Sequence, residues 1–481
     1  MTALDRAHGA PVLGVWPRSA RRPPPVHPGT EPARHAVRDV AVWTLLAAAA
    51  VLLTRLAVVA GGLADGGSPA PFAGRWSPRG GPASLLAPLV AVTVLVAVRE
   101  GVTTRLRWRP LLFAGYAAAL AWSLALALVD GHAGLVDPLA GAGQYLADVP
   151  RAAQDPGAFL RHFLDPGSGL THVTRTHPPL PVLFLAGLRA LGLSGGPGLG
   201  LLVTAIGCLA VPLVAVAVRS LCHEAAGRAL LPLLALAPWA LWTAVSIDAV
   251  VTTLCAAALA CGVLGCEHGR RGWWQTGWAL GAGLLLGMAV LFSYAVAWLA
   301  VSLLAVYFAR RTWLLGPVTA LGALLPLVLV STQGFSWAAG LTSAHQALLE
   351  TTPGGRWWGW AAADVALLLL ACGPALVASA RGIRRTPGWP FLVGAGLAVG
   401  FAVLSGLARG DVERSWLPLF PWLVAAAVAP HTRPPSRAVP GPPSGGAHAP
   451  PVVVASEVSR LVLAAGAAVA CVVAALVRSP W

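Results

Sequence analysis

The sequence contains no lysine and has little charge of either sign. Its 33 basic residues other than histidine are all arginine, against 18 acidic residues, which gives a formal net charge of +15. Charged residues make up 11% of the chain and hydrophobic residues 57%. So few charges could not cover the outside of a soluble core of this composition, so a soluble globular protein is excluded.

The chain also lacks the patterns of a disulfide framework or a metal site. It has no Cys-x-x-Cys pair, and its cysteines and histidines do not follow metal-ligand spacing. The seven cysteines are scattered, mostly in apolar runs, and are expected to be small buried side chains: Cys208, Cys222, Cys255, Cys261, Cys266, Cys372 and Cys471. We therefore expect no protein metal site and no certain cofactor, with a divalent cation left open.

What the chain has instead is repeated apolar runs of the length that crosses a bilayer as a helix, about 20 residues each. We expect an all-α fold, a polytopic transmembrane helical bundle with about 13 crossings. The expected divisions are a disordered cytoplasmic tail at 1–38, the bundle at 39–429 with an outer loop at 130–176, a Pro-rich linker at 430–457 and a last helix at 458–481.

The arginines set the orientation, because Lys and Arg concentrate in the cytoplasmic loops of membrane proteins. They lie in short segments between apolar runs and form no soluble basic face, which argues against nucleic acid as a partner. The basic segment 99–109 is expected in the cytoplasm, with the N-terminus, so the loop 130–176 lies outside. Four later arginine clusters are also cytoplasmic if 178–218, broken at 194–198, crosses once: Arg219 with Arg228, Arg270 with Arg271, Arg310 with Arg311, and Arg381 with Arg384 and Arg385.

The outer loop is the longest polar segment between apolar runs. It contains five carboxylates: Asp130, Asp137, Asp148, Asp155 and Asp165. Most of them are expected to be solvated, and Asp155-Pro and Asp165-Pro look like turns. Asp148 lies in a partly apolar stretch that could form a short helix on the membrane surface. The loop either tethers two helices or covers an active site, and we favour the active site.

Three other positions bring polar groups to the same outer face. Asp248 is a candidate helix cap and also a candidate acid that faces an outer cavity and orients an Arg or His there, and the two roles do not exclude each other. His177, before two prolines, is more often structural than functional at such a boundary. Arg414 opposes the positive-inside bias and so requires a local anion; its fork matches a lipid phosphate, and Glu413 is its neighbour in sequence.

These pieces together resemble the polyprenyl-phosphate-dependent glycosyltransferases of the GT-C superfamily, including protein O-mannosyltransferases and aminoarabinose transferases. The likeness extends over about residues 40–430 and is greatest to multi-pass members from high-GC Gram-positive bacteria. The residues that carry it are Tyr145-Leu-Ala-Asp148-Val-Pro, Ala158-Phe-Leu, Thr176-His177-Pro-Pro, Ser246-Ile-Asp248-Ala, Phe292-Ser-Tyr294, Gly373-Pro-Ala and Glu413-Arg414-Ser-Trp416-Leu-Pro.

The resemblance implies an inverting glycosyltransferase of the cell membrane that moves a sugar from a polyprenyl-phosphate donor to a glycan or protein acceptor outside the cytoplasm. It implies a catalytic base in the outer loop, with Asp148 as first choice and Asp137 as second. It also implies that His177 and Arg414 bind the donor phosphate, while Asp248 and Glu413 orient them. The chain departs from the family in two respects: the Asp-rich loop follows the third apolar run, not the first, and Gln144 stands where a second acid would help.

Two other classes remain open at this point. A transporter or flippase would carry ionisable groups near the bilayer midplane on broken helices. A non-catalytic membrane scaffold would use the outer loop to bind a partner. Acids gathered in one shared cavity favour the enzyme, whereas acids scattered over the surface favour the scaffold.

Overall fold

The computed structural model of the protein describes most of the chain between residues 31 and 479. The described residues are 31–63, 70–141, 143–165, 167–267, 272–351, 355–383, 386–406, 409, 412–428 and 459–479. Most of the predicted tail, the linker at 430–457 and four of the predicted cytoplasmic arginines (Arg270, Arg271, Arg384 and Arg385) lie outside them.

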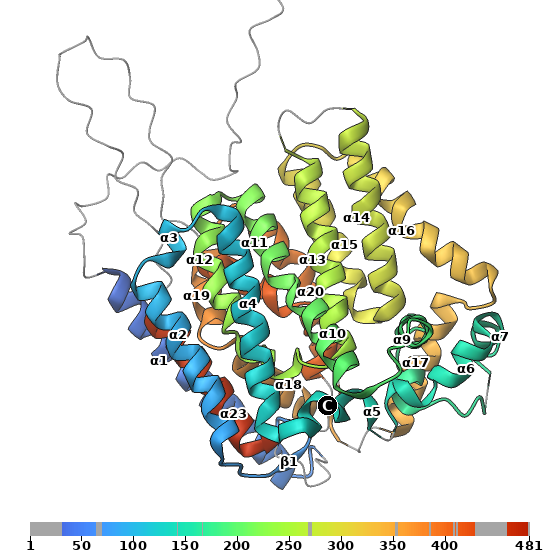
Figure 1. The fold of residues 1–481 in the computed structure, drawn as a ribbon, viewed down its shortest axis with the longest axis horizontal. Helices are drawn as coiled ribbons and strands as arrows, with labels where there is room; N and C mark the ends of the chain where they lie inside the picture. The colour runs from blue at the N-terminus through green and yellow to red at the C-terminus, as the bar shows by residue number, and fades with distance from the viewer. Residues whose placement is uncertain are drawn as a thin grey trace, which may run out of the picture.

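The fold is almost entirely helical, which confirms the predicted class (Figure 1). The longer helices are α1 (Glu31–Val59), α2 (Leu86–Arg99), α4 (Trp108–Ala127), α9 (Leu180–Ala190), α10 (Gly196–Cys208), α11 (Ala210–Leu221), α12 (Glu224–Ala235), α13 (Ile247–Gly265), α14 (Trp273–Phe292), α15 (Leu299–Ala309), α16 (Leu315–Thr332), α17 (Trp337–Thr351), α18 (Trp357–Cys372), α19 (Ala375–Gly382), α20 (Trp389–Ser405) and α23 (Arg460–Leu476). The short helices outside the outer loop are α3 (Val102–Arg105), α21 (Val412–Ser415), α22 (Phe420–Leu423) and four 3-10 turns, Pro82–Leu85, Pro238–Trp242, Tyr294–Trp298 and Ala425–Val428. One two-residue ribbon pairs β1 (Arg75–Trp76) with β2 (Val477–Arg478).

Seven helical segments in the described ranges are long and apolar enough to cross a membrane. An eighth is added if α18 and α19, bent by 92° at Gly373, count as one broken span, and four shorter apolar helices accompany them. The predicted 13 crossings therefore stay a prediction. The predicted break at 194–198 lies between α9, of 11 residues, and the 26-residue span Gly196–Leu221.

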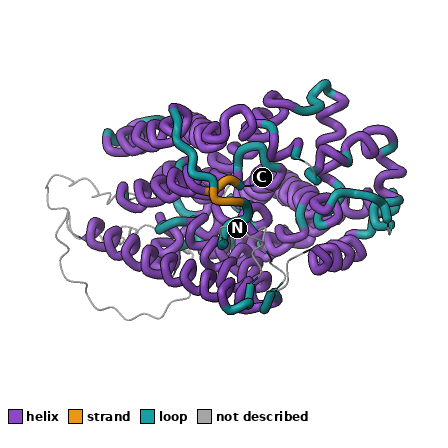
Figure 2. The backbone as a smooth tube through the Cα atoms, turned by 90° about the horizontal axis from the view of Figure 1, so that it is seen from below, coloured by secondary structure: helices purple, strands orange, loops and turns teal. Residues whose placement is uncertain are grey.

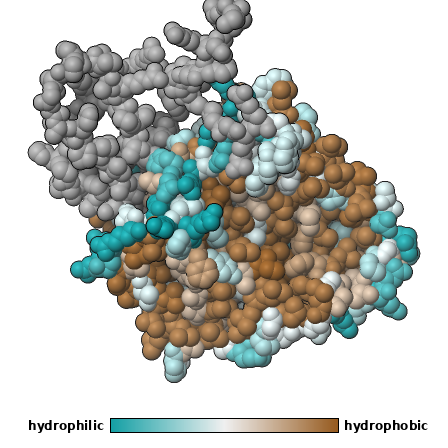
Figure 3. Space-filling model, turned by 45° about the horizontal axis from the view of Figure 1, so that its top comes forward, coloured by the Kyte–Doolittle hydropathy of each residue, from teal (hydrophilic) through white to brown (hydrophobic). Residues whose placement is uncertain are grey.

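The lateral surface of the bundle is apolar. Large hydrophobic side chains are exposed on the outer helices, among them Leu45, Leu52, Leu89, Phe113, Phe308, Leu329 and Leu404. Figure 3 shows one face of the molecule as a broad brown surface, with hydrophilic residues gathered at its margins. A soluble protein rarely exposes an apolar patch of this extent, so this is the surface that lipid covers.

Helix α13 is the centre of the bundle. In its candidate span, 78% of the hydrophobic window is buried inside the protein, and it packs against α10, α11, α14 and α15. It is apolar on all sides, as a helix surrounded by other helices must be. Its first turn carries Asp248, so the most buried helix of the fold begins at the polar residues described below.

Glycines let α14 and α16 approach closely. A Cβ atom on Gly283 would lie 2.0 Å from the carbonyl oxygen of Thr319, and one on Gly287 would lie 2.3 Å from that of Ala323. Small residues spaced by four along a helix allow backbones to pack directly in membranes, where lipid competes for larger apolar side chains.

The basic loops predicted to be cytoplasmic contact one another at one end of the bundle. Arg228 donates hydrogen bonds from Nη1 to the carbonyl oxygens of Thr103, at 2.9 Å, and Leu106, at 2.7 Å. Ser220 donates to Glu267 at 2.8 Å, and Arg310 donates to the carbonyl of Leu221 at 3.2 Å. In Figure 1 this end, marked by α3, is the upper one.

The outer loop lies at the opposite end, with α17 and the β1–β2 ribbon (Figure 1). Arg175 of the loop pairs with Glu350 of α17 at 3.2 Å. Seen from that end, the ribbon lies near the middle of the face, with loops around it (Figure 2). The structure thus separates the two sets of loops as predicted, while which set faces the cytoplasm stays a prediction.

Gly283→Ala should destabilise the bundle, because its Cβ would overlap backbone atoms of α16 that cannot move aside. Overpacking of this kind costs about 1–3 kcal/mol. Thermal unfolding of the purified protein in detergent should show a lower midpoint. Gly281→Ala, on the same helix with no atom within 4 Å of the added Cβ, is the matched control and should unfold as the wild type does. Equal midpoints for the two variants would contradict the close packing.

Single cysteines should report the orientation, because the seven native cysteines are all buried or half-buried. Exposed Gln154 lies in the outer loop and exposed Thr104 in the basic segment. A membrane-impermeant maleimide should label Gln154→Cys in intact cells, and Thr104→Cys only after permeabilisation, with the wild type as the unlabelled control. Labelling of both variants in intact cells would contradict the two-ended arrangement.

Candidate functional site

The outer loop folds into a chain of short helical turns. They are the 3-10 turn Leu128–Leu135, α5 (Asp137–Ala140), the 3-10 turn Tyr145–Ala147, α6 (Val149–Gln154), α7 (Pro156–Arg161) and α8 (His172–Arg175). Prolines at the first positions of α5, α6 and α7 explain these starts, because their missing N–H groups have no helical partner there anyway. Asp155 caps α7 by accepting a hydrogen bond from the amide of Ala158 at 2.8 Å.

Asp148, the first choice for the base, is buried and bonded inside the loop. Its residue is 3% exposed. The Oδ2 atom accepts hydrogen bonds from the amide of Thr171, at 3.0 Å, and from its hydroxyl, at 2.8 Å. Thr171 in turn caps α8 by accepting from the amide of Thr174. These contacts tie the middle of the loop to its C-terminal part and are typical of a carboxylate that organises backbone.

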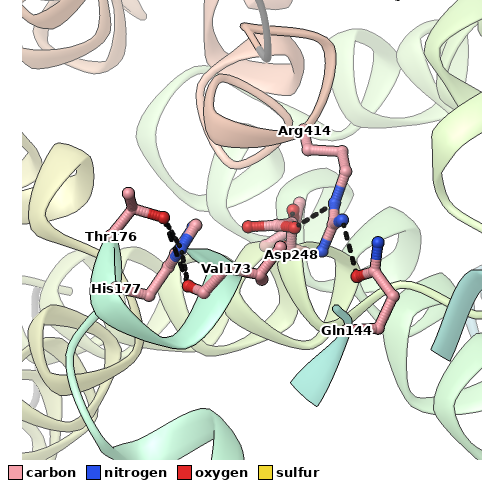
Figure 4. Close-up of polar contacts among 7 residues, drawn as sticks. Gln144, Val173, Thr176, His177, Asp248 and Arg414 are labelled. Carbon is pink, nitrogen blue, oxygen red and sulfur yellow. Dashed lines mark hydrogen bonds and ion pairs between the residues drawn. The ribbon is translucent and has the colours of Figure 1, made fainter. Parts of the chain in front are cut away.

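His177 follows α8 and is oriented by it. Its Nδ1 lies 2.9 Å from the carbonyl oxygen of Val173 and 3.2 Å from the hydroxyl of Thr176 (Figure 4). Since a carbonyl only accepts, Nδ1 carries the proton and Nε2 is the acceptor atom of the ring. The ring meets Tyr145 edge-on, with centroids 5.7 Å apart.

Asp248 and Arg414 form a buried ion pair. The Nε atom of Arg414 donates to Oδ2 of Asp248 at 2.9 Å, and the two side chains are 9% and 2% exposed. Nη1 of Arg414 also lies 3.4 Å from Oε1 of Gln144 (Figure 4). Asp248 is in the first turn of α13, where the helix dipole favours a negative charge. Asp248 therefore lies in the first turn of the helix, whose N-cap residue is Ser246, and it pairs with Arg414.

Glu413 extends this group toward a segment that sequence reasoning treated only as a connection. It is 1% exposed, and its Oε1 accepts a hydrogen bond from the amide of Ala73 at 2.7 Å. Ala73 lines a cavity at the outer end of the bundle. The buried pair and the cavity are thus linked through two adjacent residues, Glu413 and Arg414.

The cavity has a volume of about 440 Å³ and collects charged groups from three parts of the chain. They are Arg75 and Arg79 before α2, Asp130 and Asp137 in the loop, and Arg478 after α23. Phe72 and Trp242 give it an aromatic wall, with ring centroids 6.3 Å apart.

The two acids of this cavity differ in their surroundings. Asp130 forms an ion pair with Arg79 and lies 3.7 Å from Nε of Arg478. Asp137, the second choice for the base, is 61% exposed, and its Oδ2 lies 3.7 Å from Nη2 of Arg478. Asp137 is therefore the predicted base that a ligand in the cavity could touch directly.

Sequence reasoning missed Arg75, Arg79 and Arg478, although a signal for them was present. On the predicted orientation all three lie outside the cytoplasm, against the positive-inside bias, as Arg414 does. The structure brings Gln144, Asp248 and Arg414 into one hydrogen-bonded group, and it gives Asp148 and Asp137 different neighbours. Across the described segments, no group of three or more His, Cys, Asp or Glu side chains is arranged to hold a metal ion.

Comparison with known proteins bears on one part of the chain. Residues 176–337 match the family model described as dolichyl-phosphate-mannose-protein mannosyltransferase. This match confirms the glycosyltransferase resemblance for a segment that includes His177 and Asp248. No curated protein matches the chain.

Among solved structures, the crystal structure of ArnT from Cupriavidus metallidurans in the apo state is similar to this chain. The alignment has 18% identity and a TM-score of 0.43, and it covers 60% of this chain. It covers 54% of that chain, so the similarity spans about half the length of the solved protein.

Removing one member of the buried ion pair should destabilise the folded protein, because it leaves the other charge buried without its partner. Breaking such a pair costs about 3–5 kcal/mol, whereas neutral replacement of both members costs much less. We therefore expect Arg414→Gln to lower the unfolding midpoint strongly and Arg414→Gln with Asp248→Asn to recover most of the loss. A double-mutant cycle on thermal unfolding measures this, and additive effects would contradict the coupling.

Proposed function

We propose that the protein is a membrane glycosyltransferase that moves a sugar from a polyprenyl-phosphate donor to a hydroxyl group of an envelope glycan or protein outside the cytoplasm. The observation that carries the proposal is the cavity of about 440 Å³, where carboxylates, arginines and an aromatic wall meet at one end of an apolar bundle. The family match over residues 176–337 supports the reaction class.

The chemistry requires a base and a cationic environment. The carboxylate takes the proton of the acceptor hydroxyl as its oxygen attacks the anomeric carbon of the sugar. The bond from that carbon to the phosphate oxygen breaks in the same displacement, and the phosphate leaves with the electron pair. One displacement inverts the anomeric centre. Arginines stabilise the charge that develops on the leaving phosphate.

The surroundings of the two predicted bases support Asp137 ahead of Asp148. Asp137 is 61% exposed and lines the cavity, so an acceptor hydroxyl can reach its carboxylate. Asp148 is 3% exposed, and both of its described hydrogen bonds come from Thr171. In this proposal Asp148 is a positioning residue that holds the loop and, through α8, the ring of His177.

The remaining predicted residues take supporting roles. His177 and Arg414, which lie outside the lining of the cavity, are proposed to bind the donor phosphate. Asp248 orients Arg414 by the ion pair at 2.9 Å. Glu413 orients the segment before α2, which lines the cavity, by its hydrogen bond from the amide of Ala73. The place of this group at the end of the bundle supports a transferase over a transporter that binds at mid-depth.

A deletion strain complemented with variants tests the proposal. Envelope glycans should lose a sugar in the deletion strain and regain it with the wild type. Asp137→Asn should restore none at equal membrane abundance, since loss of a general base costs about 10²–10⁴-fold in rate. Asp165→Asn is the matched control, because this exposed carboxylate pairs with His162 in the same loop and should restore the sugar fully.

The outcomes separate the alternatives. Asp148→Asn should restore a reduced amount in proportion to its lower abundance. Restoration by Asp137→Asn but not by Asp148→Asn, at equal abundance, would make Asp148 the base. An unchanged glycan profile in the deletion strain would contradict the transferase. Restoration of the sugar is also measured in membranes of the complemented strain with and without EDTA, because the sequence leaves open whether a divalent cation takes part.

A further inference from the structure

Four arginines of the basic segment 99–109 have no carboxylate partner in the folded protein. They are Arg99 at the end of α2, Arg105 at the end of α3, and Arg107 and Arg109 at the start of α4. All four are exposed, and none forms an ion pair within the described part of the chain. Glu100 is the one acid of the segment, so four arginines against one acid give it a net charge of +3.

Two other arginines at the same end of the bundle are neutralised inside the protein. Glu224 pairs with Arg219 at 2.8 Å and with Arg228 at 2.7 Å. Both guanidinium groups also lie over the ring of Trp108, with their central carbon atoms 4.6 and 5.9 Å from its centroid. The fold therefore uses the charges of these two arginines, whereas it leaves those of the basic segment pointing out of the protein.

The opposite end of the bundle shows how an arginine that holds the fold is bonded. Arg79 pairs with Asp130, and its Nη2 donates a hydrogen bond to the carbonyl oxygen of Ala474 at 2.5 Å. The four arginines of the basic segment make no comparable ion pairs with described residues. Water alone can satisfy an exposed arginine, so what these four contact depends on where the segment lies relative to the bilayer.

The rest of the protein holds the basic segment in one conformation. Arg228 donates from Nη1 to the carbonyl oxygens of Thr103 and Leu106, so it fixes both ends of the turn from α3 into α4. Gly101 has a φ of +73° where the chain leaves α2, and the hydroxyl of Thr104 donates to its carbonyl at 2.8 Å. A ligand of the four arginines therefore does not have to order the segment before it binds.

The basic segment borders the lipid-covered surface on both sides. Val96, one turn before Arg99 on α2, is 50% exposed, and Phe113, one turn after Arg109 on α4, is 71% exposed. One helical turn is about 5 Å long. The headgroup layer on each side of a bilayer is about 5–8 Å deep. The four arginines therefore lie at the depth of the lipid headgroups.

We infer that the basic segment 99–109 is a binding surface for anionic phospholipids of the surrounding leaflet. The fork of an arginine matches the phosphate oxygens of a headgroup. Each basic side chain near an anionic membrane surface strengthens binding about fivefold. Because the partner is the bilayer itself, the inference is independent of the cavity at the opposite end and stands whether or not the protein transfers sugars.

Native mass spectrometry of the purified full-length protein in neutral detergent measures this binding. Phosphatidylglycerol is the anionic probe, and phosphatidylcholine is the control lipid without net charge. We expect the first molecule of phosphatidylglycerol to bind about tenfold more tightly than the first molecule of phosphatidylcholine. Raising the concentration of ammonium acetate should reduce this difference, because salt screens exposed charges.

Variants locate the surface. Arg105→Gln with Arg107→Gln should weaken the binding of phosphatidylglycerol about 25-fold, since two of the four charges are lost. Arg105→Lys with Arg107→Lys should keep most of the affinity, because the charges remain. Arg151→Gln with Arg161→Gln is the matched control. It removes the same charge from two exposed arginines of the outer loop and should leave binding unchanged.

The unfolding midpoint with and without lipid shows that each variant is folded. Phosphatidylglycerol should raise the midpoint of the wild type and of the Arg151 and Arg161 control, but not that of the Arg105→Gln and Arg107→Gln variant. A rise of the same size with inorganic phosphate would assign the arginines to free phosphate and overturn the inference.

Three results of the binding measurement would also overturn it. They are equal affinity of the wild type for the two lipids, equal affinity of the wild type and the Arg105→Gln and Arg107→Gln variant for phosphatidylglycerol, and equal weakening by the control variant. In the last case the net charge of the protein, and not the basic segment, would determine the binding.

Discussion

The ion pair between Asp248 and Arg414 is the interaction on which the outer end of the bundle depends. It joins the first turn of the most buried helix to a short helix 166 residues later in the chain. The same guanidinium reaches Gln144 in the outer loop, and the adjacent Glu413 bonds the segment before α2. A buried pair of this kind adds little net stability, but an arrangement that separates its two members leaves a buried charge without its partner and is therefore disfavoured.

The arginines at this end show how the fold accommodates charges that the positive-inside bias disfavours. Arg79 pairs with Asp130, Arg175 with Glu350 and Arg414 with Asp248. Each of these guanidinium groups has a carboxylate from a distant part of the chain. On the predicted orientation, local pairing of this kind removes most of the penalty for basic residues outside the cytoplasm, because the group as a whole carries little net charge. Arg75 and Arg151 at the same end have no carboxylate partner among the described residues; Arg75 lines the cavity, whereas Arg151 donates to the carbonyl of Ser168 at 2.7 Å.

Much of the fold could be predicted from the sequence, because a membrane-spanning helix can be recognised from the apolar composition of a short stretch of chain. The apolar runs at 40–61, 85–98, 111–128 and 461–477 lie within or close to α1, α2, α4 and α23. The break at 194–198 was visible as a cluster of glycine and proline. The gathering of the polar loops at one end followed from counting arginines. Each of these features can be recognised from residues that are close in sequence, together with the known thickness of a bilayer.

The site was harder to predict because its contacts join distant residues. The burial of Asp148 depends on Thr171, 23 residues away, and nothing in the sequence around either residue indicates the pairing. The ribbon is two residues long on each side and has no alternating pattern to recognise. The role of Gln144 as a partner of Arg414 likewise appears only when the loop is folded back onto α13. Residue types therefore indicated the chemistry, but only the assembled bundle distinguishes an acid that holds backbone from one that faces a cavity.

The tie between Arg79 and the end of α23 has a consequence for how the protein is made. The arginine and the carbonyl of Ala474 are 395 residues apart in the chain, so they meet only after nearly all the intervening helices have entered the membrane. At ribosomal speeds of about 5–20 residues per second, this interval lasts about 20–80 s. Until then the cavity lacks Arg478 and the end of α23, which form part of its lining. The cavity is therefore complete only after α23 has entered the membrane. A chain that stalls or is truncated before α23 would insert its other helices but would lack the complete cavity.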